Sequence, residues 1–320
     1  MQNQILKTAY LVMAHKNVQQ LLRLIHVLKN PESDVFLHLD NHMDDVDALE
    51  KAGAIITTKR FHGILFDYSL VNIEICLMKT AIEYGETNGI KYHYFCLLSG
   101  QDFPLISAID IQKELNNQYP KAFIDCTPRA TTNWLAHRAE HLALYSFCYP
   151  KICDYANKIK TKSIRRMVKF PFYVLDKLLS KRFGVQKQMD RAGLKLYGGS
   201  QWWILPDMIV EDILNSIRAS DTRYTIIKTI YGPDETFFQS MIMNGPYAKK
   251  IEINPSDQVS QNCKTFAFFK KKGFPFVGHP YVFTKEEINL LDSKKSTHYF
   301  ARKFDTLIDE EVLNWIESNY

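Results

Sequence analysis

The sequence predicts an α/β fold in which a largely parallel central sheet is flanked by helices, and three observations support this fold class. Short apolar runs typical of buried strands alternate with segments of helical periodicity over the first 125 residues. A chain of 320 residues with 46% hydrophobic residues can bury a substantial core. Neither a Pro/Gly/Ser-rich linker nor an internal repeat divides the sequence, so residues 1–320 are expected to form a single domain.

The expected strands cover residues 8–15, 34–40, 54–60, 92–100 and 121–126. The expected helices between them cover residues 18–30, 46–53 and 69–85, and the last has a serine cap and a glycine stop. In a parallel sheet the carboxyl ends of the strands meet at one edge, where ligands bind. The side chains expected at this edge are polar: His15, Lys16, Asp40, Ser99, Gln101, Asp102 and Asp125.

Residues 151–187 form a basic segment, and a basic amphipathic helical region is expected at about 150–190. Eleven lysines and arginines are interleaved there with apolar residues, against two aspartates. The whole chain has a formal net charge of +5, so the remainder is slightly acidic. This pattern indicates a cationic surface suited to anionic lipid. Nucleic acid is not an expected partner, because no RNP or zinc-finger string accompanies the segment.

The absence of several common motifs disfavours the classes of enzyme that depend on them. The sequence contains no GxGxxG or GxxxxGK[ST] phosphate loop, no HExxH motif, no GxSxG elbow and no CxxC pair. The first 17 residues lack the apolar core of a signal peptide, and no later run approaches about 20 apolar residues. We therefore expect a cytoplasmic location, with peripheral contact at the inner face of the membrane through the basic segment.

One string resembles a metal motif. Residues 44–47, "DDVD", contain a D-x-D pattern, which can hold a divalent ion between phosphates. They lie several residues beyond the expected strand end, where Asp44 or Asp45 would cap a helix that begins near Val46. We favour the cap interpretation, so no metal ligand and no cofactor is expected.

Two strings contain candidate site residues. In "LLSGQDFPL" (97–105) a Ser-Gly turn lets the backbone approach a ligand and presents Gln101 and Asp102; the alternative is an Asx-type turn in which Asp102 bonds local backbone. "GGSQWW" (198–203) offers Ser200 on a flexible turn and two adjacent indoles. Strand alternation predicts that at most one indole, assigned to Trp202, contacts a ligand, while the other lies in the core.

The ordered strings "AYLVMAHKN", "VFLHLD", "FCLLSGQDFPL", "YGGSQWWILP", "GPDETFFQS" and "FARKFD" resemble the core-2/I-branching β-1,6-N-acetylglucosaminyltransferase family, which includes the peptide O-xylosyltransferases. The resemblance extends from about residue 8 to residue 305 and is strongest to bacterial members. It implies a GT-A-type fold and an inverting, metal-independent transfer of a sugar from a UDP donor to a hydroxyl of a glycan or lipid-linked glycan.

The resemblance also implies residue roles. Glu235 of "PDE" matches the family's catalytic base, and Lys303 of "KFD" matches a cation that neutralises the donor diphosphate. The family's second cation has no clear counterpart in "VGHPYVFT" (277–284), so Arg302, His279 or one of Lys270, Lys271 and Lys272 is expected to replace it. The donor side is expected to comprise His15, Asp40, Gln101, Asp102, Ser200, Arg302 and Lys303.

Trp202 and Asp234 are assigned to the acceptor side, and Asp234 is also expected to cap the following helix. The chemistry agrees with these roles: one carboxylate takes the proton of the attacking hydroxyl, and cations stabilise the departing phosphate.

Several alternatives remain open. The most favoured donor is UDP-GlcNAc, for surface polysaccharide synthesis, and UDP-xylose or UDP-glucose is the alternative. A function of another class is a non-catalytic module that binds anionic membrane through the basic segment. Acceptor contacts in relatives lie in the middle segment, which here offers Arg129, Trp134, His137, Arg138 and Glu140, although a solvated helix face is the simpler interpretation for each.

Overall fold

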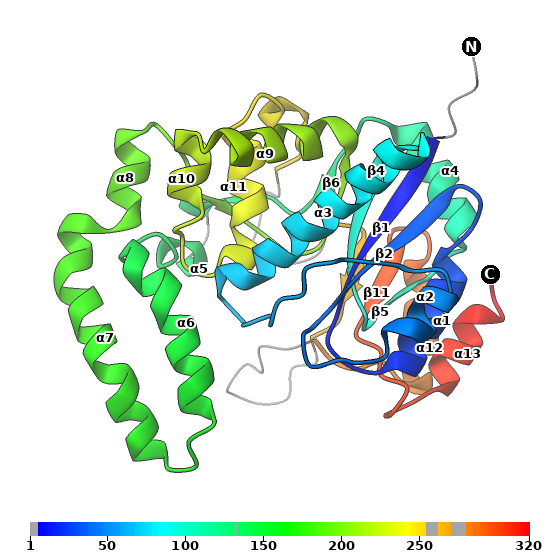
Figure 1. The fold of residues 1–320 in the computed structure, drawn as a ribbon, viewed down its shortest axis with the longest axis horizontal. Coiled ribbons are helices and arrows are strands. Elements are labelled where there is room, and N and C mark those ends of the chain that lie inside the picture. The colour runs from blue at the N-terminus through cyan, green and yellow to red at the C-terminus, as the bar shows by residue number, and fades with distance from the viewer. Residues whose placement is uncertain (1–5, 132, 254–261, 270–279) are drawn as a thin grey trace.

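The computed structural model describes residues 6–131, 133–253, 262–269 and 280–320, and their main feature is a six-stranded sheet (Figure 1). Its strand order is β3-β2-β1-β4-β9-β6. The bounds are β1 Leu6–Ala14, β2 Ser33–Leu39, β3 Ile55–Ile56, β4 Lys91–Ser99, β6 Phe123–Ile124 and β9 Trp203–Pro206. Strands β1, β2, β3 and β4 pair in parallel, whereas β9 is antiparallel to both of its neighbours. The predicted α/β class with a largely parallel sheet is therefore confirmed.

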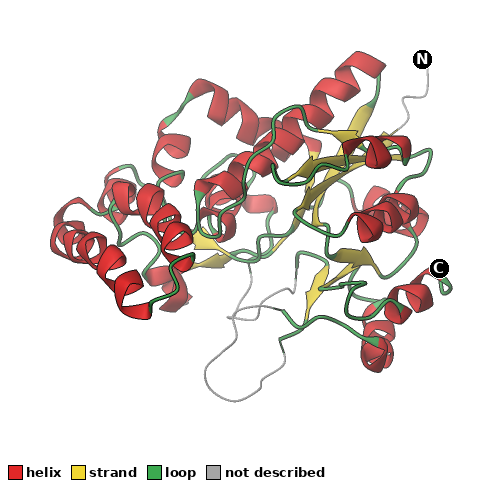
Figure 2. Ribbon diagram, turned by 60° about the horizontal axis from the view of Figure 1, so that its bottom comes forward, coloured by secondary structure: helices red, strands yellow, loops and turns green. Residues whose placement is uncertain are grey.

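Helices cover both faces of this sheet because the central strands are apolar on both sides. Ala9 and Leu11 of β1 pack into one hydrophobic cluster, and Tyr10 and Val12 pack into the other. The first cluster includes residues of α3 (Tyr68–Asn88), α9 (Asp207–Ala219) and α11 (Phe237–Met243). The second includes residues of α1 (Val18–Leu28), α4 (Ala108–Gln118), α12 (Ile288–Lys294) and α13 (Glu311–Glu317). In Figure 2 the strands lie between these two sets of helices.

Two smaller sheets complete the carboxyl edge. β5 (Asp102–Pro104) pairs with β11 (Phe300–Arg302), which also pairs with β10 (Thr265–Ala267). β7 (Thr127–Pro128) pairs with β8 (Tyr197–Gly198). The short helices of the chain are α2 (Val46–Lys51), α5 (Asn133–Ala136), α8 (Val185–Arg191) and α10 (Thr222–Ile227), with 3₁₀ turns at η1 (Arg129–Thr131), η2 (Pro233–Glu235), η3 (Ala248–Lys250) and η4 (Lys285–Glu287).

The strand predicted at residues 121–126 is present but shorter than predicted. Only Phe123 and Ile124 are paired, and their partner is β9. The antiparallel β9, built from "WILP", is inserted between β4 and β6, a long-range pairing that no local pattern encodes. The strand expected at 54–60 is likewise reduced to Ile55–Ile56.

The basic segment is helical, as predicted. α6 (Ala143–Asn157) and α7 (Lys162–Phe183) form a helical hairpin that extends away from the sheet (Figure 1). Only one residue of α7, Asp176, is buried. Its carboxylate accepts hydrogen bonds from the backbone N–H of Leu142 at 2.8 Å and from His141 Nδ1 at 2.7 Å, and so fixes the base of the hairpin.

Candidate functional site

The carboxyl ends of the parallel strands bring together most of the predicted site residues. His15 follows β1, Asp40 follows β2, and Gln101 follows β4 in the turn that leads into β5. The backbone of Gln101 accepts from Phe304 N–H at 2.8 Å, which ties this turn to the "RKFD" segment. Gln20 of α1 strengthens the link, because its amide donates to the carbonyls of both Gly100 and Phe304. Segments about 200 residues apart therefore share one edge of the sheet.

Glu235 lies in η2, at the end of the "GPDE" turn. The backbone carbonyl of Glu235 accepts a hydrogen bond from Gly199 N–H at 3.0 Å, so the turn packs against the "GGSQWW" loop. Gly199 approaches so closely that a Cβ there would overlap the carbonyl oxygen of Asp125. The Glu235 side chain is 37% exposed, which leaves its carboxylate accessible to a ligand.

Arg138 holds the Glu235 carboxylate. Its Nη2 donates to Glu235 Oε2 at 2.5 Å, and its guanidinium lies over the rings of Phe66, Trp134 and Tyr231 at 4.9, 5.5 and 5.7 Å from their centroids. Planar guanidinium groups stack on aromatic faces while still donating in plane. The arginine is therefore fixed in position and presents its donors to the candidate base.

Burial raises the pKa of Glu235, and the adjacent Arg138 guanidinium opposes this rise. Burial and the neighbouring Glu235 charge also raise the pKa of Asp234. Asp234 is buried, and its Oδ1 forms no hydrogen bond with any residue that the structure describes. Two adjacent carboxyl groups thus have different environments: Asp234 faces the interior, whereas the Glu235 side chain is partly exposed.

The prediction that Asp234 caps the following helix was wrong. Thr236 occupies the N-cap position of α11, and Gly232 precedes η2. The 3₁₀ turn "PDE" separates Asp234 from the α-helix, and this extra turn directs the Asp234 side chain inward. Its burial also leaves little surface through which it could contact an acceptor directly.

The "GGSQWW" loop connects the Glu235 turn to the cationic "RK" pair. Arg302 lies 4.1 Å above the Trp202 ring, and Trp202 itself is largely buried beneath it. Trp203 is fully buried, and Trp202 belongs to the same hydrophobic cluster, so the predicted alternation of one indole inward and one outward is not observed. Ser200 lies at the turn, where its carbonyl accepts from Gln239 of α11 at 2.8 Å.

Asp102 supports Arg302 from below. It has no exposed surface, and its carboxylate accepts from both the backbone N–H and the hydroxyl of Ser99 at 2.8 Å. Its Oδ1 also lies 3.5 Å from Arg302 Nη1. The local turn anticipated as the alternative for "SGQD" is therefore formed, and Asp102 is buried beneath Arg302.

Arg302 and Lys303 form the cationic side of the site. Burial lowers the pKa of Arg302, and its Nε and Nη1 find no hydrogen-bond acceptor among the described residues. Burial, together with neighbouring Arg302, also lowers the pKa of Lys303. Burial, Lys16 and Lys303 lower the pKa of His15, which places these cations within interaction range of the β1 end. An anion is the ligand that would relieve this accumulated positive charge.

Glu74 of α3 supports the loop from the core. Its two carboxylate oxygens accept from Gln201 Nε2 at 3.1 Å and from Trp203 Nε1 at 3.2 Å. Complete burial raises its pKa well above the ordinary value. Sequence analysis missed Glu74, because a carboxylate within a helical pattern is normally solvated.

Asp40 lies beside a second histidine-containing loop. Its carboxylate accepts from the backbone N–H of Gly63 at 3.0 Å and faces His42 and His62. Burial by itself would raise the pKa of Asp40. The hydrogen bonds lower this pKa by more than burial raises it, so the net shift is downward. The carboxylate therefore stays charged at neutral pH.

The remaining candidates lie elsewhere. Asp45 occupies the N-cap position of α2, as the cap interpretation predicted, although its side chain forms no cap hydrogen bond. His279, Lys270, Lys271 and Lys272, considered as the second cation, lie outside the described residues.

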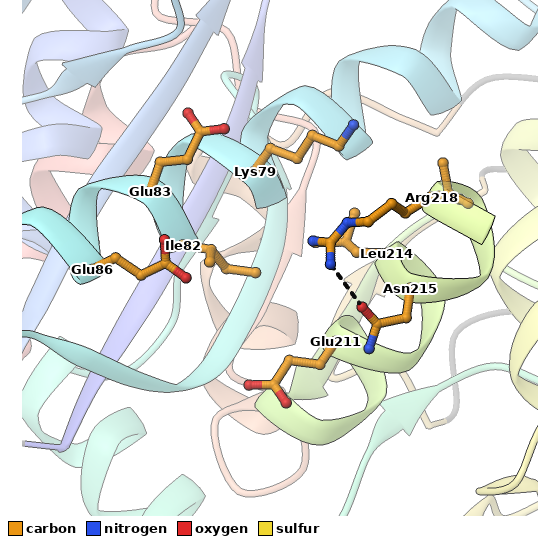
Figure 3. A pocket seen from close by; sticks show the side chains of 9 residues that line it. Lys79, Ile82, Glu83, Glu86, Glu211, Leu214, Asn215 and Arg218 are labelled. Atoms are coloured by element: carbon orange, nitrogen blue, oxygen red, sulfur yellow. Dashed lines mark hydrogen bonds between the residues drawn. The ribbon is translucent and has the colours of Figure 1, made fainter.

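A cavity of about 650 Å³ lies between α3 and α9 (Figure 3), lined by Lys79, Ile82, Glu83, Glu86, Glu211, Leu214, Asn215, Ile217 and Arg218. An adjoining cavity reaches Lys91 and Tyr92 at the start of β4. Both therefore lie toward the amino end of that strand, away from the predicted site residues.

No described helix is long and apolar enough to cross a membrane.

The family model "Core-2/I-Branching enzyme" matches residues 8–267. The chain is 22% identical over 326 residues to rat xylosyltransferase 2, which covers 98% of this chain and 33% of the relative. Human xylosyltransferase 2 is 21% identical, with 97% and 33% covered.

Mouse beta-1,3-galactosyl-O-glycosyl-glycoprotein beta-1,6-N-acetylglucosaminyltransferase 4 is 22% identical over 318 residues, with 94% of this chain and 62% of the relative covered. The chain thus spans about one third of the length of the xylosyltransferases it matches. The family match covers most of the sequence, including all six strands of the central sheet. On these grounds the chain belongs to the core-2/I-branching enzyme family.

Proposed function

We propose that this protein is an inverting glycosyltransferase that transfers a sugar from a UDP donor to a hydroxyl of a glycan acceptor. One observation carries the proposal: the carboxylate of Glu235, held by Arg138, and the cationic pair of Arg302 and Lys303 flank the same "GGSQWW" loop. A base on one side of a site and cations on the other are the two requirements of a direct displacement at an anomeric carbon.

In this mechanism Glu235 takes the proton of the acceptor hydroxyl as its oxygen attacks the anomeric carbon. The bond to the β-phosphate breaks on the opposite face, and the leaving UDP takes the bonding electron pair. Arg302 and Lys303 stabilise the charge that develops on the diphosphate, so the transfer step is proposed to need no metal ion. Trp202 positions Arg302 from beneath, and Asp102 keeps the guanidinium in place.

The donor is proposed to be UDP-GlcNAc, and UDP-xylose is the main alternative because the relatives named above include both enzyme types. UDP-glucose is a further candidate. A hydroxyl of a surface glycan or of its lipid-linked precursor is the proposed acceptor. The name of each relative describes that relative only, so the donor has to be measured on this chain.

The test is UDP release by the purified protein with each of the three donors, with and without candidate glycan acceptors. Glu235→Gln should lower turnover by about 10²–10⁴-fold while donor binding remains. Glu286→Gln, an exposed change in η4, is the matched control. Turnover that survives in Glu235→Gln would remove the base role, and dependence on added Mn²⁺ would favour the D-x-D string. No binding of any UDP-sugar by calorimetry would favour a non-catalytic module.

The helical hairpin is proposed to dock on anionic membrane, which would bring the site to a lipid-linked acceptor. Seven basic residues of α7 accompany a single acidic one, the buried Asp176. Large apolar side chains of α7 are between 45% and 73% exposed: Ile164, Met167, Phe170, Leu175 and Leu178. Four of them, at 164, 167, 175 and 178, recur at a spacing that places them on one face of a helix. Apolar side chains beside cations match an anionic bilayer surface.

Vesicle sedimentation tests this docking. The protein should bind phosphatidylserine-containing vesicles, release them at high salt and ignore pure phosphatidylcholine. A Met167→Asp/Leu178→Asp variant should lose binding, whereas Leu307→Asp, at a more exposed apolar residue outside the hairpin, should retain it. Salt-independent binding, or self-association of the wild type through the same two residues in solution, would contradict membrane docking.

A further inference from the structure

Asp40, His42 and His62 meet at the carboxyl end of β2. The Nδ1 atom of His42 lies 2.6 Å from Asp40 Oδ1, and the Nδ1 atom of His62 lies 3.1 Å from Asp40 Oδ2. One ligand atom from each residue falls within 4.8 Å of the other two. We propose that these three side chains form a binding site for a divalent cation of the zinc type, distinct from the D-x-D string at 45–47.

The orientation of His42 supports this assignment. Its Nε2 lies 3.0 Å from the backbone carbonyl oxygen of His15. A carbonyl oxygen only accepts, so Nε2 carries the hydrogen of this bond. Nδ1 is then the nitrogen that faces the cluster, where it donates to the Asp40 carboxylate until a bound ion takes the place of that hydrogen. Histidines that bind metals in proteins are oriented in this way, by donating their other ring N–H to a carbonyl or carboxylate.

His62 is positioned by the backbone on either side of it. The backbone N–H of Phe61 donates to His38 Nε2 at 2.9 Å, and that of Gly63 donates to Asp40 Oδ2 at 3.0 Å. Arg60 fixes the opposing loop, because its guanidinium donates to the carbonyl oxygens of Leu39 and Asp40. The two loops that supply the ligands are therefore held together before any ion binds, which reduces the cost of ordering them.

The three ligand atoms indicate the type of ion, and the exposure of the histidines indicates how it enters. Two imidazole nitrogens with one carboxylate oxygen are a ligand set that suits zinc better than the hard ions magnesium and calcium. The His42 and His62 side chains are 57% and 46% exposed, whereas the Asp40 side chain is 7% exposed. An ion can therefore enter from solvent, and a fourth position remains for water or for an oxygen of a bound ligand.

Cobalt(II) titration tests the site, because tetrahedral cobalt with imidazole ligands absorbs strongly in the visible range. The wild type should develop a saturable absorption band at one equivalent that zinc then abolishes. His42→Gln and His62→Gln should each weaken cobalt binding by more than about tenfold. His26→Gln, an exposed change on α1 outside the cluster, should behave as the wild type. Both cluster histidines are about half exposed, so the variants should keep the wild-type circular dichroism.

A wild type without a saturable band would overturn the proposal, as would a band that persists in both His42→Gln and His62→Gln. A weak band of octahedral type would contradict the proposed zinc-type, tetrahedral site. The measurement does not depend on glycosyl transfer, so its result stands whether or not the proposed activity is found. Cobalt binding with unchanged turnover after chelation would place the cation outside the transfer step.

Discussion

The Arg138 guanidinium lies 2.5 Å from the Glu235 carboxylate, although 97 residues separate them along the chain. This contact joins the segment before the helical hairpin to the "GPDE" turn. Tyr231 extends the link, because its ring stacks beneath Arg138 and also contacts His141 at the base of the hairpin. The position of the candidate base therefore depends on residues at the root of the proposed docking element.

Replacing Arg138 should change the pH dependence of transfer. Burial raises the pKa of Glu235, and Arg138 opposes that rise. In Arg138→Gln the pKa of Glu235 should therefore increase further. A base works only when deprotonated, so the acidic limb of the kcat/KM profile should move to higher pH, with a larger loss at pH 6 than at pH 9.

Arg138→Lys, which keeps the charge, should restore part of that shift. His137→Gln, an exposed neighbouring change, should leave the profile in place. A loss of equal size at every pH would show that Arg138 serves only the local fold.

Removing Lys303 should weaken binding of the diphosphate but not of the nucleoside. A charged hydrogen bond contributes about 1.5–3 kcal/mol, so Lys303→Ala should lower UDP affinity about tenfold or more. Calorimetry with UDP and with uridine separates the two contributions, and Lys113→Ala on the surface of α4 is the control. An equal loss for uridine would place Lys303 away from the phosphates.

Gly232→Ala should impair transfer beyond its effect on stability. Gly232 has a φ of 65°, and a Cβ there would collide with Nη1 of Arg138. Gly89 has a φ of 67° with no atom within 4 Å of such a Cβ, so Gly89→Ala isolates the backbone strain. Each variant should lose about 1–2 kcal/mol of unfolding free energy. Only Gly232→Ala should lose turnover, and similar turnover in both would contradict the proposed role of Arg138.

Glu74 should make the protein less stable at alkaline pH. Its folded-state pKa is raised by burial above the value of about 4.3 for an unfolded chain. The folded state thus binds this proton more tightly, and that contribution to stability is lost as pH rises toward the folded-state pKa. Urea unfolding at pH 6 and pH 9 should show a smaller decline in Glu74→Gln than in the wild type. Glu86→Gln, on the exposed face of α3, should decline as the wild type does, and equal declines in all three would refute the assignment.

Several elements could be predicted from local pattern alone. The strands at 8–15, 34–40 and 92–100 are near-continuous apolar runs, and their type and approximate bounds agree with the structure. The helix predicted at 69–85 is also present, but its serine cap and glycine stop were wrong, because Asp67 caps it and it continues through Gly85 to Gly89. The polar residues after these strands were also placed at one edge, because parallel strands share their direction. The strand predicted at 121–126 is shorter in the structure, because its length is set by pairing with β9, which lies 80 residues further along the chain.

The sequence by itself determined the fold class and the polar edge at the ends of the parallel strands, because these follow from residue periodicity and strand direction. The tertiary structure alone decided that Arg138 holds Glu235, that Arg302 lies over Trp202, and that Asp40 faces His62. Each of these depends on contacts between segments that fold together from distant parts of the chain. Spacing along a sequence carries no direct record of such distances, since only the packed core brings those segments into contact.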